Sequence, residues 1–278
     1  MKFTKWQGCG NDFVLVDGME ESIRDYATFA QKVCDRHYGV GADGVLVVLP
    51  SDTADFRMRI FNTDGSEAEM CGNGIRCFAR YLHDYGRTEK KEFTVETGAG
   101  ILTPFLTIED GQAPLVTVDM GEPVLAGDDI PVSGFGKEPV IHAPISVAGQ
   151  EFSMTCVSMG NPHCVIFTDR MESVPLGKWG PLLESHPMFP RRTNVEFAEV
   201  QDSQKIRMRV WERGAAITLA CGTGSCATLV AAVLNEKTER KAVIELDGGM
   251  LIVEWMEEDN HVYMTGPAEL VFEGELEC

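Results

Sequence analysis

Basic residues are scarce in this sequence. Its 278 residues include 24 Lys and Arg against 43 Asp and Glu, which gives a formal net charge of −19 at pH 7. A surface that binds nucleic-acid phosphates needs a patch of positive charge, so this balance argues against a nucleic-acid partner. The acidic excess is typical of a solvated surface.

Long apolar runs are also absent. None approaches the length that spans a bilayer, and the first residues lack the apolar segment of a secretory signal. The nine cysteines never form a Cys-x-x-Cys pair, which gives little support to a zinc site. We therefore expect no membrane partner, no metal site and a reducing cytoplasm, with most thiols, such as Cys34, Cys156 and Cys164, packed as small apolar groups.

The sequence does contain an internal repeat whose copies are 150 residues apart. An Arg-Met-Arg segment precedes Cys71-Gly72-Asn73-Gly74, and a second one precedes Cys221-Gly222-Thr223-Gly224 at the same spacing. The same offset relates Gly10-Asn11 to Gly160-Asn161. Self-similarity without gaps indicates two copies of one supersecondary unit, each with a cysteine in the same place.

Both cysteines are expected at the N-terminus of a helix. The run 227–234 that follows the second cysteine has no charge, which predicts a helix buried on all sides. The first amides of a helix have no partner inside it, so they form an anion site that glycines allow a ligand to approach. A cysteine in this place should have a lowered pKa and be reactive.

We expect an α+β fold of two pseudo-symmetric domains, each a mostly antiparallel β-sheet wrapped around a central buried helix. The length is sufficient for two cores. The N-terminal domain is expected to comprise residues 1–120 plus 266–278 and to carry Cys71, and the C-terminal domain to comprise residues 121–265 and to carry Cys221. Residues 121–136, rich in Gly, Pro and Asp, are the expected crossover.

Local patterns predict four helices among short strands. Helices are expected at about 22–36, 72–85 and 176–184 and over the run after Cys221. Hairpin turns are expected at Asp110-Gly111, Ala148-Gly149 and Asp247-Gly248-Gly249. Strands are expected at 3–6, 13–16, 45–49, 56–61, 164–167, 195–200, 206–211, 242–246, 251–256 and 262–272, the last broken at Gly266-Pro267.

Two cysteines on opposite sides of one carbon can invert a stereocentre. One thiolate removes a proton from one face, and the other thiol delivers a proton to the opposite face. With a pKa of about 8.5, an unperturbed thiol is only a few per cent ionised at neutral pH, and a helix N-terminus raises that fraction. Both helix ends would also stabilise the charge that develops on a bound carboxylate, provided that the domains close over one ligand.

Two other interpretations use the same residues. Cys71 and Cys221 can form a redox pair, although we expect a disulfide between them only as an inactivating side reaction. Cys221 with His163 can form the nucleophile pair of a hydrolase or transferase, but this leaves Cys71 without a role.

The sequence resembles the diaminopimelate epimerase family, the pyridoxal-independent epimerases of lysine and peptidoglycan-precursor biosynthesis. The motifs that carry the resemblance follow the family's order and cover almost the whole chain. They are Gly8-Cys9-Gly10-Asn11-Asp12-Phe13, Met70-Cys71-Gly72-Asn73-Gly74-Ile75-Arg76-Cys77, Gly160-Asn161-Pro162-His163, Arg192-Thr193-Asn194-Val195-Glu196, Trp211-Glu212-Arg213-Gly214 and Ala220-Cys221-Gly222-Thr223-Gly224.

The resemblance implies a role for each group of residues. Cys71 and Cys221 match the two acid–base cysteines, and His163 and Glu212 match residues that tune or orient them, Glu212 also lying beside the substrate. The backbone at Gly72-Asn73 and Gly222-Thr223 matches the part that holds the reacting carboxylate. The residues matching those that hold the rest of the substrate are Asn11, Asn62, Asn161, Asn194 and Arg213.

The chemistry of these side chains agrees with the implied roles. The planar fork of Arg213 suits a distal carboxylate, and an asparagine amide can donate to a carboxylate and accept from an ammonium group. Two departures from the family bear on substrate preference. Ala216-Ile217-Thr218 stands where the family often has Gly-Glu-Thr, and Gly44 stands where some members have Gln.

We therefore expect an epimerase that interconverts LL- and meso-diaminopimelate without a cofactor. Its partner is a small-molecule substrate, and the resemblance implies a homodimer. Another two-cysteine racemase, acting on proline, hydroxyproline or histidine, is the nearest alternative. A redox-sensing binding protein on the same scaffold is an alternative of a different class.

Overall fold

The chain divides into two compact units. The computed structural model describes residues 1–109 and 112–277, so the turn expected at Asp110-Gly111 lies outside the described residues. Unit 1 comprises Met1–Asp119 and Thr265–Cys278, and unit 2 comprises Met120–Met264. Within the described residues, no helix combines the length and the apolar character that crossing a membrane demands.

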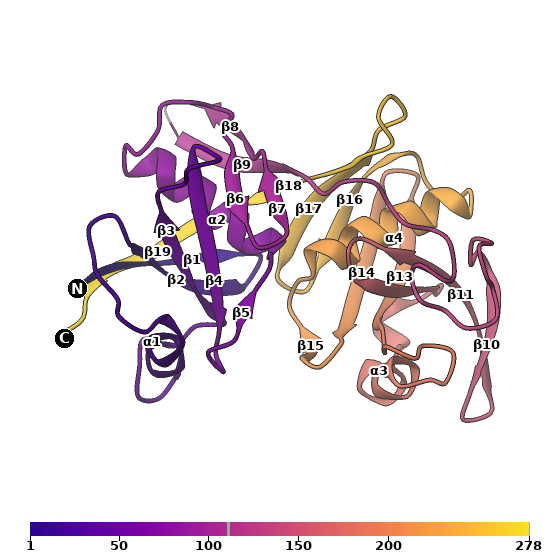
Figure 1. The fold of residues 1–278 in the computed structure, drawn as a ribbon. Coiled ribbons are helices and arrows are strands. Elements are labelled where there is room, and N and C mark those ends of the chain that lie inside the picture. The colour runs from indigo at the N-terminus through magenta and orange to yellow at the C-terminus, as the bar shows by residue number, and fades with distance from the viewer. Residues whose placement is uncertain (110–111, 278) are drawn as a thin grey trace. The chain divides into compact units, whose positions relative to one another are not determined.

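Unit 1 contains one sheet, a further hairpin whose strand β9 pairs with β18 (Val262–Pro267), and two helices (Figure 1). The sheet has the order β19-β1-β2-β3-β4-β6-β7, with β5 paired to β4, and β8 and β9 form the antiparallel hairpin. The bounds are β1 (Lys2–Gly8), β2 (Asn11–Asp17), α1 (Tyr26–Val33), β3 (Gly44–Leu49), β4 (Phe56–Asn62), β5 (Glu67–Ala68), α2 (Gly72–Asp84), β6 (Val95–Thr97), β7 (Gly100–Leu102), β8 (Phe105–Glu109), β9 (Gln112–Asp119) and β19 (Glu269–Glu275).

Unit 2 repeats this plan. Its strands follow the order β10-β11-β12-β13-β14-β16-β17-β18, with β15 paired to β14, and the chain leaves the unit within β18. The bounds are β10 (Ala143–Val147), β11 (Gln150–Ser158), β12 (Pro162–Phe167), the 3₁₀ helix η1 (Met171–Ser173), α3 (Leu176–Glu184), β13 (Asn194–Asp202), β14 (Lys205–Glu212), β15 (Ala216–Thr218), α4 (Gly222–Leu234), β16 (Lys241–Leu246), β17 (Gly249–Trp255) and β18 (Val262–Pro267).

Both sheets are mostly antiparallel but contain parallel pairs. β2 runs parallel to β3 with Phe13 opposite Gly44, and β12 runs parallel to β13 with His163 opposite Asn194. Parallel neighbours need a crossover connection, and α1 and α3 lie in these crossovers. Because each pairing recurs 150 residues later, the repeat in the sequence is a repeat of structure, and the two units can be compared residue by residue.

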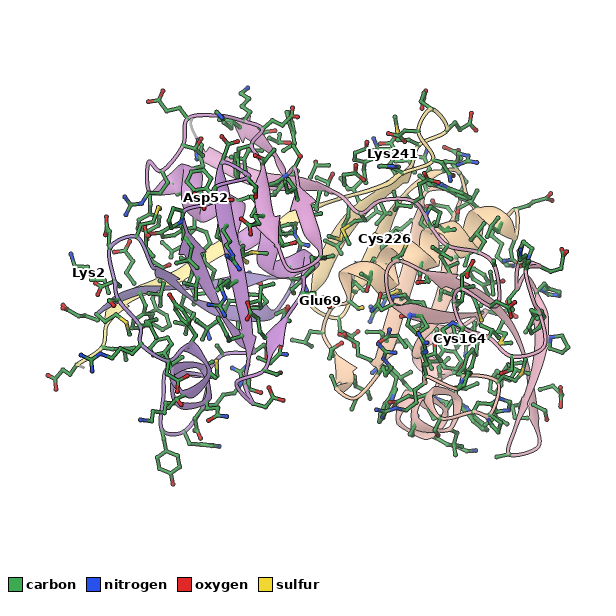
Figure 2. All side chains as sticks on the ribbon, viewed as in Figure 1. Lys2, Asp52, Glu69, Cys164, Cys226 and Lys241 are labelled. Carbon is green, nitrogen blue, oxygen red and sulfur yellow. The ribbon has the colours of Figure 1, made fainter. Side chains whose placement is uncertain are left out.

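A buried helix lies at the centre of each unit. The run after Cys221 forms α4, whose residues 222 and 224–232 are buried and which contacts strands β11 to β14, β16 and β17. Cys226, labelled in Figure 2, is one of its fully buried side chains. In unit 1, α2 contacts β1 to β4 and β9 and buries Ile75, Phe78 and Leu82 completely. The predicted α+β fold, with sheets around central helices, is confirmed.

Several predicted element bounds differ from those of the structure. The helix expected at 22–36 is the shorter α1, because Asp25 caps it by accepting a hydrogen bond from the Thr28 amide and Ile23 precedes it. β12 begins at Pro162, two residues before the strand expected at 164–167, since Pro162 and the residues after it pair at once with β11. The run 262–272 breaks at Ala268 rather than at Gly266-Pro267.

Candidate active site

Each central helix begins with a cysteine as its N-cap. Cys71 has φ −144° and ψ 118°, and Cys221 has φ −132° and ψ 113°, the extended conformation that N-cap residues adopt. Each sulfur accepts a hydrogen bond from the amide three residues on, over 3.4 Å from Gly74 and 3.3 Å from Gly224. Both thiols therefore lie at the positive end of a helix dipole, as predicted from the repeat.

The Cys71 thiol lies in a network of neutral amides. Its Sγ donates to Asn11 Oδ1 over 3.7 Å, and Asn73 Nδ2 donates to the same oxygen over 3.2 Å. Asn73 Oδ1 in turn accepts from Arg76 over 2.9 Å. Arg76 is fully buried, and its guanidinium also donates to the carbonyls of Gly72 and Pro267. The buried Arg76 cation thus contacts Asn73, one of the two amides near Cys71.

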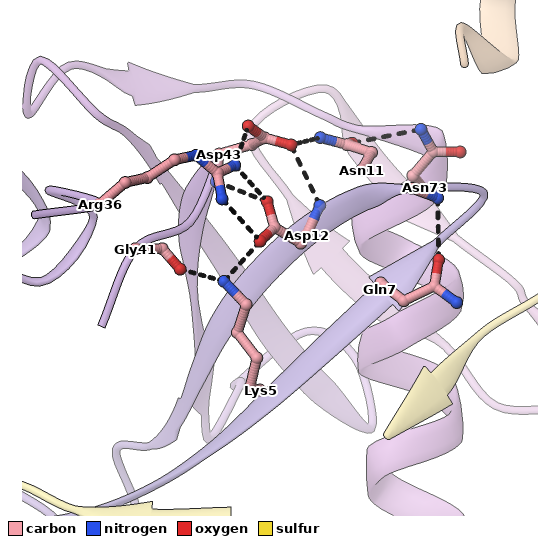
Figure 3. Close-up of polar contacts among 9 residues, drawn as sticks. Lys5, Gln7, Asn11, Asp12, Arg36, Gly41, Asp43 and Asn73 are labelled. Carbon is pink, nitrogen blue, oxygen red and sulfur yellow. Dashed lines mark hydrogen bonds and ion pairs between the residues drawn. The ribbon is translucent and has the colours of Figure 1, made fainter. Parts of the chain in front are cut away.

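An ionic cluster fixes the orientation of Asn11 (Figure 3). Asn11 Nδ2 donates to Asp43 over 2.9 Å, which leaves Oδ1 to face the Cys71 thiol. Arg36 bridges Asp43 and Asp12 at 2.9 Å and 2.7 Å, and Asp12 also pairs with the buried Lys5 at 2.6 Å. Although burial alone raises the pKa of Asp12, hydrogen bonds from Arg36 and Lys5 outweigh it and bring that pKa to about 2.

Replacing Asp12 with Asn should destabilise the protein in a pH-dependent way. A carboxyl whose pKa is depressed in the folded state stabilises it at pH values above about 4 and loses that contribution as the pH falls through about 2. We expect Asp12→Asn to cost about 2 kcal/mol or more at neutral pH, measured by urea unfolding. The difference from wild type should shrink between pH 4 and pH 2.

Asp52 supplies the control for this substitution. It is an exposed residue between β3 and β4, labelled in Figure 2, and Asp52→Asn is expected to change stability by no more than about 0.5 kcal/mol. A cost for Asp12→Asn that stays constant between pH 7 and pH 2 would contradict the electrostatic explanation.

The Cys221 thiol has acidic neighbours instead. It lies 3.5 Å from the Thr223 hydroxyl, and its charged neighbours include the Glu212 carboxylate, which accepts from Thr218 Oγ1. Burial raises the pKa of Glu212, and the negative charge of Glu196 adds to the increase. Burial, followed by the charges of Glu212 and Glu196, raises the pKa of Cys221 well above its ordinary value.

The lowered pKa predicted for this cysteine is therefore wrong for the structure as it stands. The helix end does act in the predicted direction, because the hydrogen bond from the Gly224 amide lowers the pKa of Cys221. Loss of hydration is the larger effect, because a thiolate with 5% exposure has little water to stabilise it. Cys221 is accordingly a thiol in this state, with a carboxylate beside it.

His163 and Glu196 form a buried pair beside Cys221. Both side chains have no exposed surface, and His163 Nδ1 lies 2.7 Å from Glu196 Oε1. The other ring nitrogen, Nε2, lies 2.9 Å from Asn161 Oδ1. Glu196 thus holds the imidazole ring through Nδ1, and the ring in turn holds the Asn161 side chain through Nε2.

The loop that carries Arg213 is held by two buried polar side chains. The Arg213 amide donates to Asn194 Oδ1 over 2.9 Å, and Asn194 Nδ2 donates to the Pro162 carbonyl over 2.8 Å. Glu184 accepts from Trp211 Nε1 over 2.6 Å and from the Gly214 amide over 3.1 Å. Arg213 itself is exposed, with one guanidinium nitrogen 3.0 Å from the Arg191 carbonyl.

Comparisons with known proteins give the family. The model of the family described as diaminopimelate epimerase matches residues 3–126 and 155–271. A diaminopimelate epimerase of Acetivibrio thermocellus is 55% identical over 277 residues, which cover 100% of this chain and 99% of that protein. One of Methanococcus maripaludis strain C5 is 52% identical, with 100% of both chains covered. The chain belongs to the diaminopimelate epimerase family.

Solved structures with little sequence similarity share the fold. A phenazine biosynthesis protein of the PhzF family from Bacillus anthracis superposes with a TM-score of 0.71 at 17% identity, covering 100% of this chain and 99% of that chain. A hydroxyproline epimerase from Agrobacterium vitis, solved with trans-4-hydroxy-L-proline bound, gives 0.69 at 17% identity and covers 99% and 90%. The fold is therefore common to proteins with different names.

In this member of the diaminopimelate epimerase family, the residues implied by the resemblance fall into separate groups. Around Cys71 lie Asn11 and Asn73; around Cys221 lie Thr223 and Glu212. The remaining members are placed differently. Asn161 contacts His163, Asn194 supports the Arg213 loop, and Asn62 donates to the Ser66 hydroxyl in the turn after β4.

The two departures from the family pattern have structural counterparts. Gly44 lies on a buried strand where an added Cβ would be 2.9 Å from the Phe61 carbonyl oxygen, so this backbone does not accept a side chain there without moving. In the segment Ala216-Ile217-Thr218, Ile217 stands where the family often has Glu and is 45% exposed, while Thr218, which matches the family's Thr, donates its hydroxyl to Glu212.

Several residues that hold the site had no role predicted from the sequence. Glu196, Glu184, Asp43 and Arg76 each orient a residue next to a cysteine or the Arg213 loop. Glu196 and Arg76 occur in the quoted motifs, and a charge inside an otherwise apolar strand or helix is the signal that could have found them.

Proposed function

We propose that this chain interconverts LL- and meso-diaminopimelate by moving the α-proton between two cysteines, without a cofactor. The observation that carries the proposal is the matched pair of N-cap thiols, Cys71 and Cys221, in two copies of one structural unit. The names of its close relatives support the same reaction. Packing alone does not explain why both copies keep a cysteine where Ser, Thr, Asp or Asn is the usual cap.

The proposed step moves one proton off the substrate and one onto it. One cysteine, as thiolate, takes the α-proton, and the electron pair of the broken C–H bond moves toward the α-carboxylate. The other cysteine then gives its S–H proton to the opposite face of the same carbon, and its sulfur becomes the thiolate. The two sulfurs exchange roles for the reverse reaction.

The helix ends supply the electrostatic part of this reaction. The backbone at Gly72-Asn73 and Gly222-Thr223 is proposed to donate to the substrate carboxylate as negative charge develops on it, where fixed donors contribute most. Glu212 is proposed as the group that exchanges a proton with Cys221, since its charge acts directly on the thiol and burial raises the pKa of Glu212 toward the range of a useful base.

The distal end of the substrate is assigned to the polar residues that the resemblance indicates. Arg213 is proposed to bind the distal carboxylate, because its guanidinium is exposed while its backbone is fixed by Asn194 and Glu184. The asparagines assigned to the rest of the substrate are Asn11, Asn62, Asn161 and Asn194. A substrate with a second amino-acid end offers a partner to all these groups, whereas proline has no second amino-acid end.

Exchange of the α-proton tests the reaction directly. We expect that LL-diaminopimelate incubated with the reduced protein in D2O, with no added cofactor, loses its α-proton NMR signal as the meso isomer forms. Proline, hydroxyproline and histidine, tested in parallel, should show no exchange. Exchange with one of these and not with diaminopimelate would favour another racemase. No exchange with any of them, alongside a reversible Cys71–Cys221 disulfide, would favour a redox-sensing protein.

The proposal extends to the state of the protein in the cell. The resemblance supports a homodimer in the cytoplasm, with a small molecule as substrate and no nucleic-acid or membrane partner. A reducing compartment keeps both acid–base cysteines as thiols, the form in which the described cysteines occur here.

A further inference from the structure

The two units differ in the side chain that faces the glycine three residues after each catalytic-site cysteine. An added Cβ on Gly74 would meet Leu46 Cδ2 at 3.1 Å and Cys71 Sγ at 3.7 Å. An added Cβ on Gly224, the equivalent residue, would meet Glu196 Oε1 at 2.7 Å and Cys221 Sγ at 3.2 Å. Leu46 and Glu196 are 150 residues apart and therefore occupy the same position in the two copies. A carboxylate stands behind one thiol where a methyl group stands behind the other.

The neighbouring positions show the same difference. Phe13 in unit 1 corresponds to His163 in unit 2, because each lies opposite the first residue of the next parallel strand. Asn62 corresponds to Glu212, and the buried cation Arg76 corresponds to Cys226. Around Cys71 the equivalent positions are neutral or cationic, and around Cys221 they carry two carboxylates and a histidine.

The fold does not require the buried His163–Glu196 pair. Phe13 and Leu46 fill the equivalent positions of unit 1 with 3% and 0% exposure. Removing a carboxylate from water is energetically costly unless its partners compensate. Here the compensation is incomplete, because Glu196 Oε2 has no hydrogen-bond partner among the described residues. A costly group in a position that leucine can fill indicates a function.

The contacts of the pair specify what that function can be. His163 Nδ1 faces Glu196 and Nε2 faces Asn161 Oδ1, so both ring nitrogens meet oxygen atoms and both can donate only when the ring carries two protons. The carboxylate therefore fixes the ring, and through it the Asn161 amide. Groups that titrate and face Cys221 are Glu212 from β14 and Glu196 from β13, with His163 from β12 behind Glu196.

We infer that Glu196 is a positioning residue for proton transfer at Cys221: it fixes His163 and, through it, Asn161, and it places a carboxylate next to the Cys221 thiol. The role of Glu196 in turnover rests on the proposed function. Glu196 touches neither substrate nor reacting atoms in this assignment and acts through the thiol and the imidazole. The two cysteines are thereby made unequal, since Leu46 gives Cys71 no such charge.

Titration of the two thiols in Glu196→Gln tests the inference. Gln keeps the shape of the side chain and removes its charge. With ¹³Cβ-labelled cysteine and signals assigned by Cys71→Ser and Cys221→Ser, NMR follows the ionisation of each thiol. The Cys221 midpoint should move at least about one pH unit lower, because a nearby like charge disfavours the thiolate. The Cys71 midpoint in the same molecule should stay in place and serves as the control.

A second variant copies the unit 1 arrangement. The double substitution His163→Phe with Glu196→Leu installs the pair that already packs in unit 1, so it is expected to fold, and its Cys221 midpoint should also move to lower pH. If Glu196→Gln fails to fold, this variant decides the question. An unchanged Cys221 midpoint, or an equal shift at Cys71, would overturn the inference.

Turnover gives a readout that a purely structural role would not move. We expect kcat/KM of Glu196→Gln to fall about 10²-fold, as a small displacement of a reacting group can cause, and the limb of its pH profile that reports thiol ionisation to move to lower pH. If Glu196→Gln keeps the kcat/KM and the pH profile of the wild type, Glu196 has no role in proton transfer. Because the NMR titration needs no substrate, a wild-type protein inactive on diaminopimelate would contradict the proposed function and leave the titration result standing.

Discussion

Alanine at either Cys71 or Cys221 is expected to reduce epimerisation by at least about 10³-fold, since each substitution removes an acid–base group that the reaction uses on one face of the substrate. The two variants should be equally inactive in turnover, because inversion needs both sulfurs. Loss of the α-proton signal in D2O and formation of the second isomer, followed together by NMR, measure the effect.

The central helices provide matched controls for these variants. Cys77 on α2 and Cys226 on α4 are fully buried thiols a few residues beyond the N-caps, and burial raises the pKa of Cys77 to about 12. Buried thiols of this kind are inert, so Cys77→Ala and Cys226→Ala should retain turnover. Wild-type turnover in Cys71→Ala or in Cys221→Ala would end the two-base mechanism, and so would equal losses in all four variants.

The parts of the fold predicted from the sequence are those that depend on local pattern. The repeat located both cysteines at helix N-termini because glycines follow each of them, and residues 227–232 of the uncharged run after Cys221 are buried. The helix expected at 22–36 extends too far on both sides because periodicity alone does not show where a cap ends it. The Asp25 side chain, as the N-cap, marks the residue at which the helix begins.

The polar surroundings of the cysteines depend on distant parts of the chain. His163 and Glu196 meet because β12 and β13 are parallel neighbours, and nothing local at either residue indicates that pairing. The pKa of Cys221 was predicted in the wrong direction for a related reason: a helix end is visible in a sequence, whereas loss of hydration and the approach of Glu212 and Glu196 are not. Comparison of the two copies offers the missing signal, since Leu46 and Glu196 differ at one equivalent position.

Replacing Arg213 with Met is expected to reduce kcat/KM for diaminopimelate by about 10²- to 10³-fold, mainly through KM. A charge-assisted pair with a carboxylate contributes several kcal/mol when one partner is removed, and a contact remote from the reacting carbon binds ground state and transition state alike. The backbone of this loop is fixed by Asn194 and Glu184, so the substitution should leave its conformation unchanged.

Three comparisons isolate the guanidinium of Arg213. Arg191→Met removes an exposed cation from the adjoining segment and should leave kcat/KM near the wild-type value. Arg213→Lys keeps the charge but loses the planar fork, so its kcat/KM should lie between those of wild type and Arg213→Met. A diaminopimelate analogue that lacks the distal carboxylate should be processed equally poorly by wild type and Arg213→Met. If Arg213→Met lowers activity on that analogue as much as on diaminopimelate, Arg213 does not bind the distal carboxylate, and the assignment of this loop to substrate specificity is wrong.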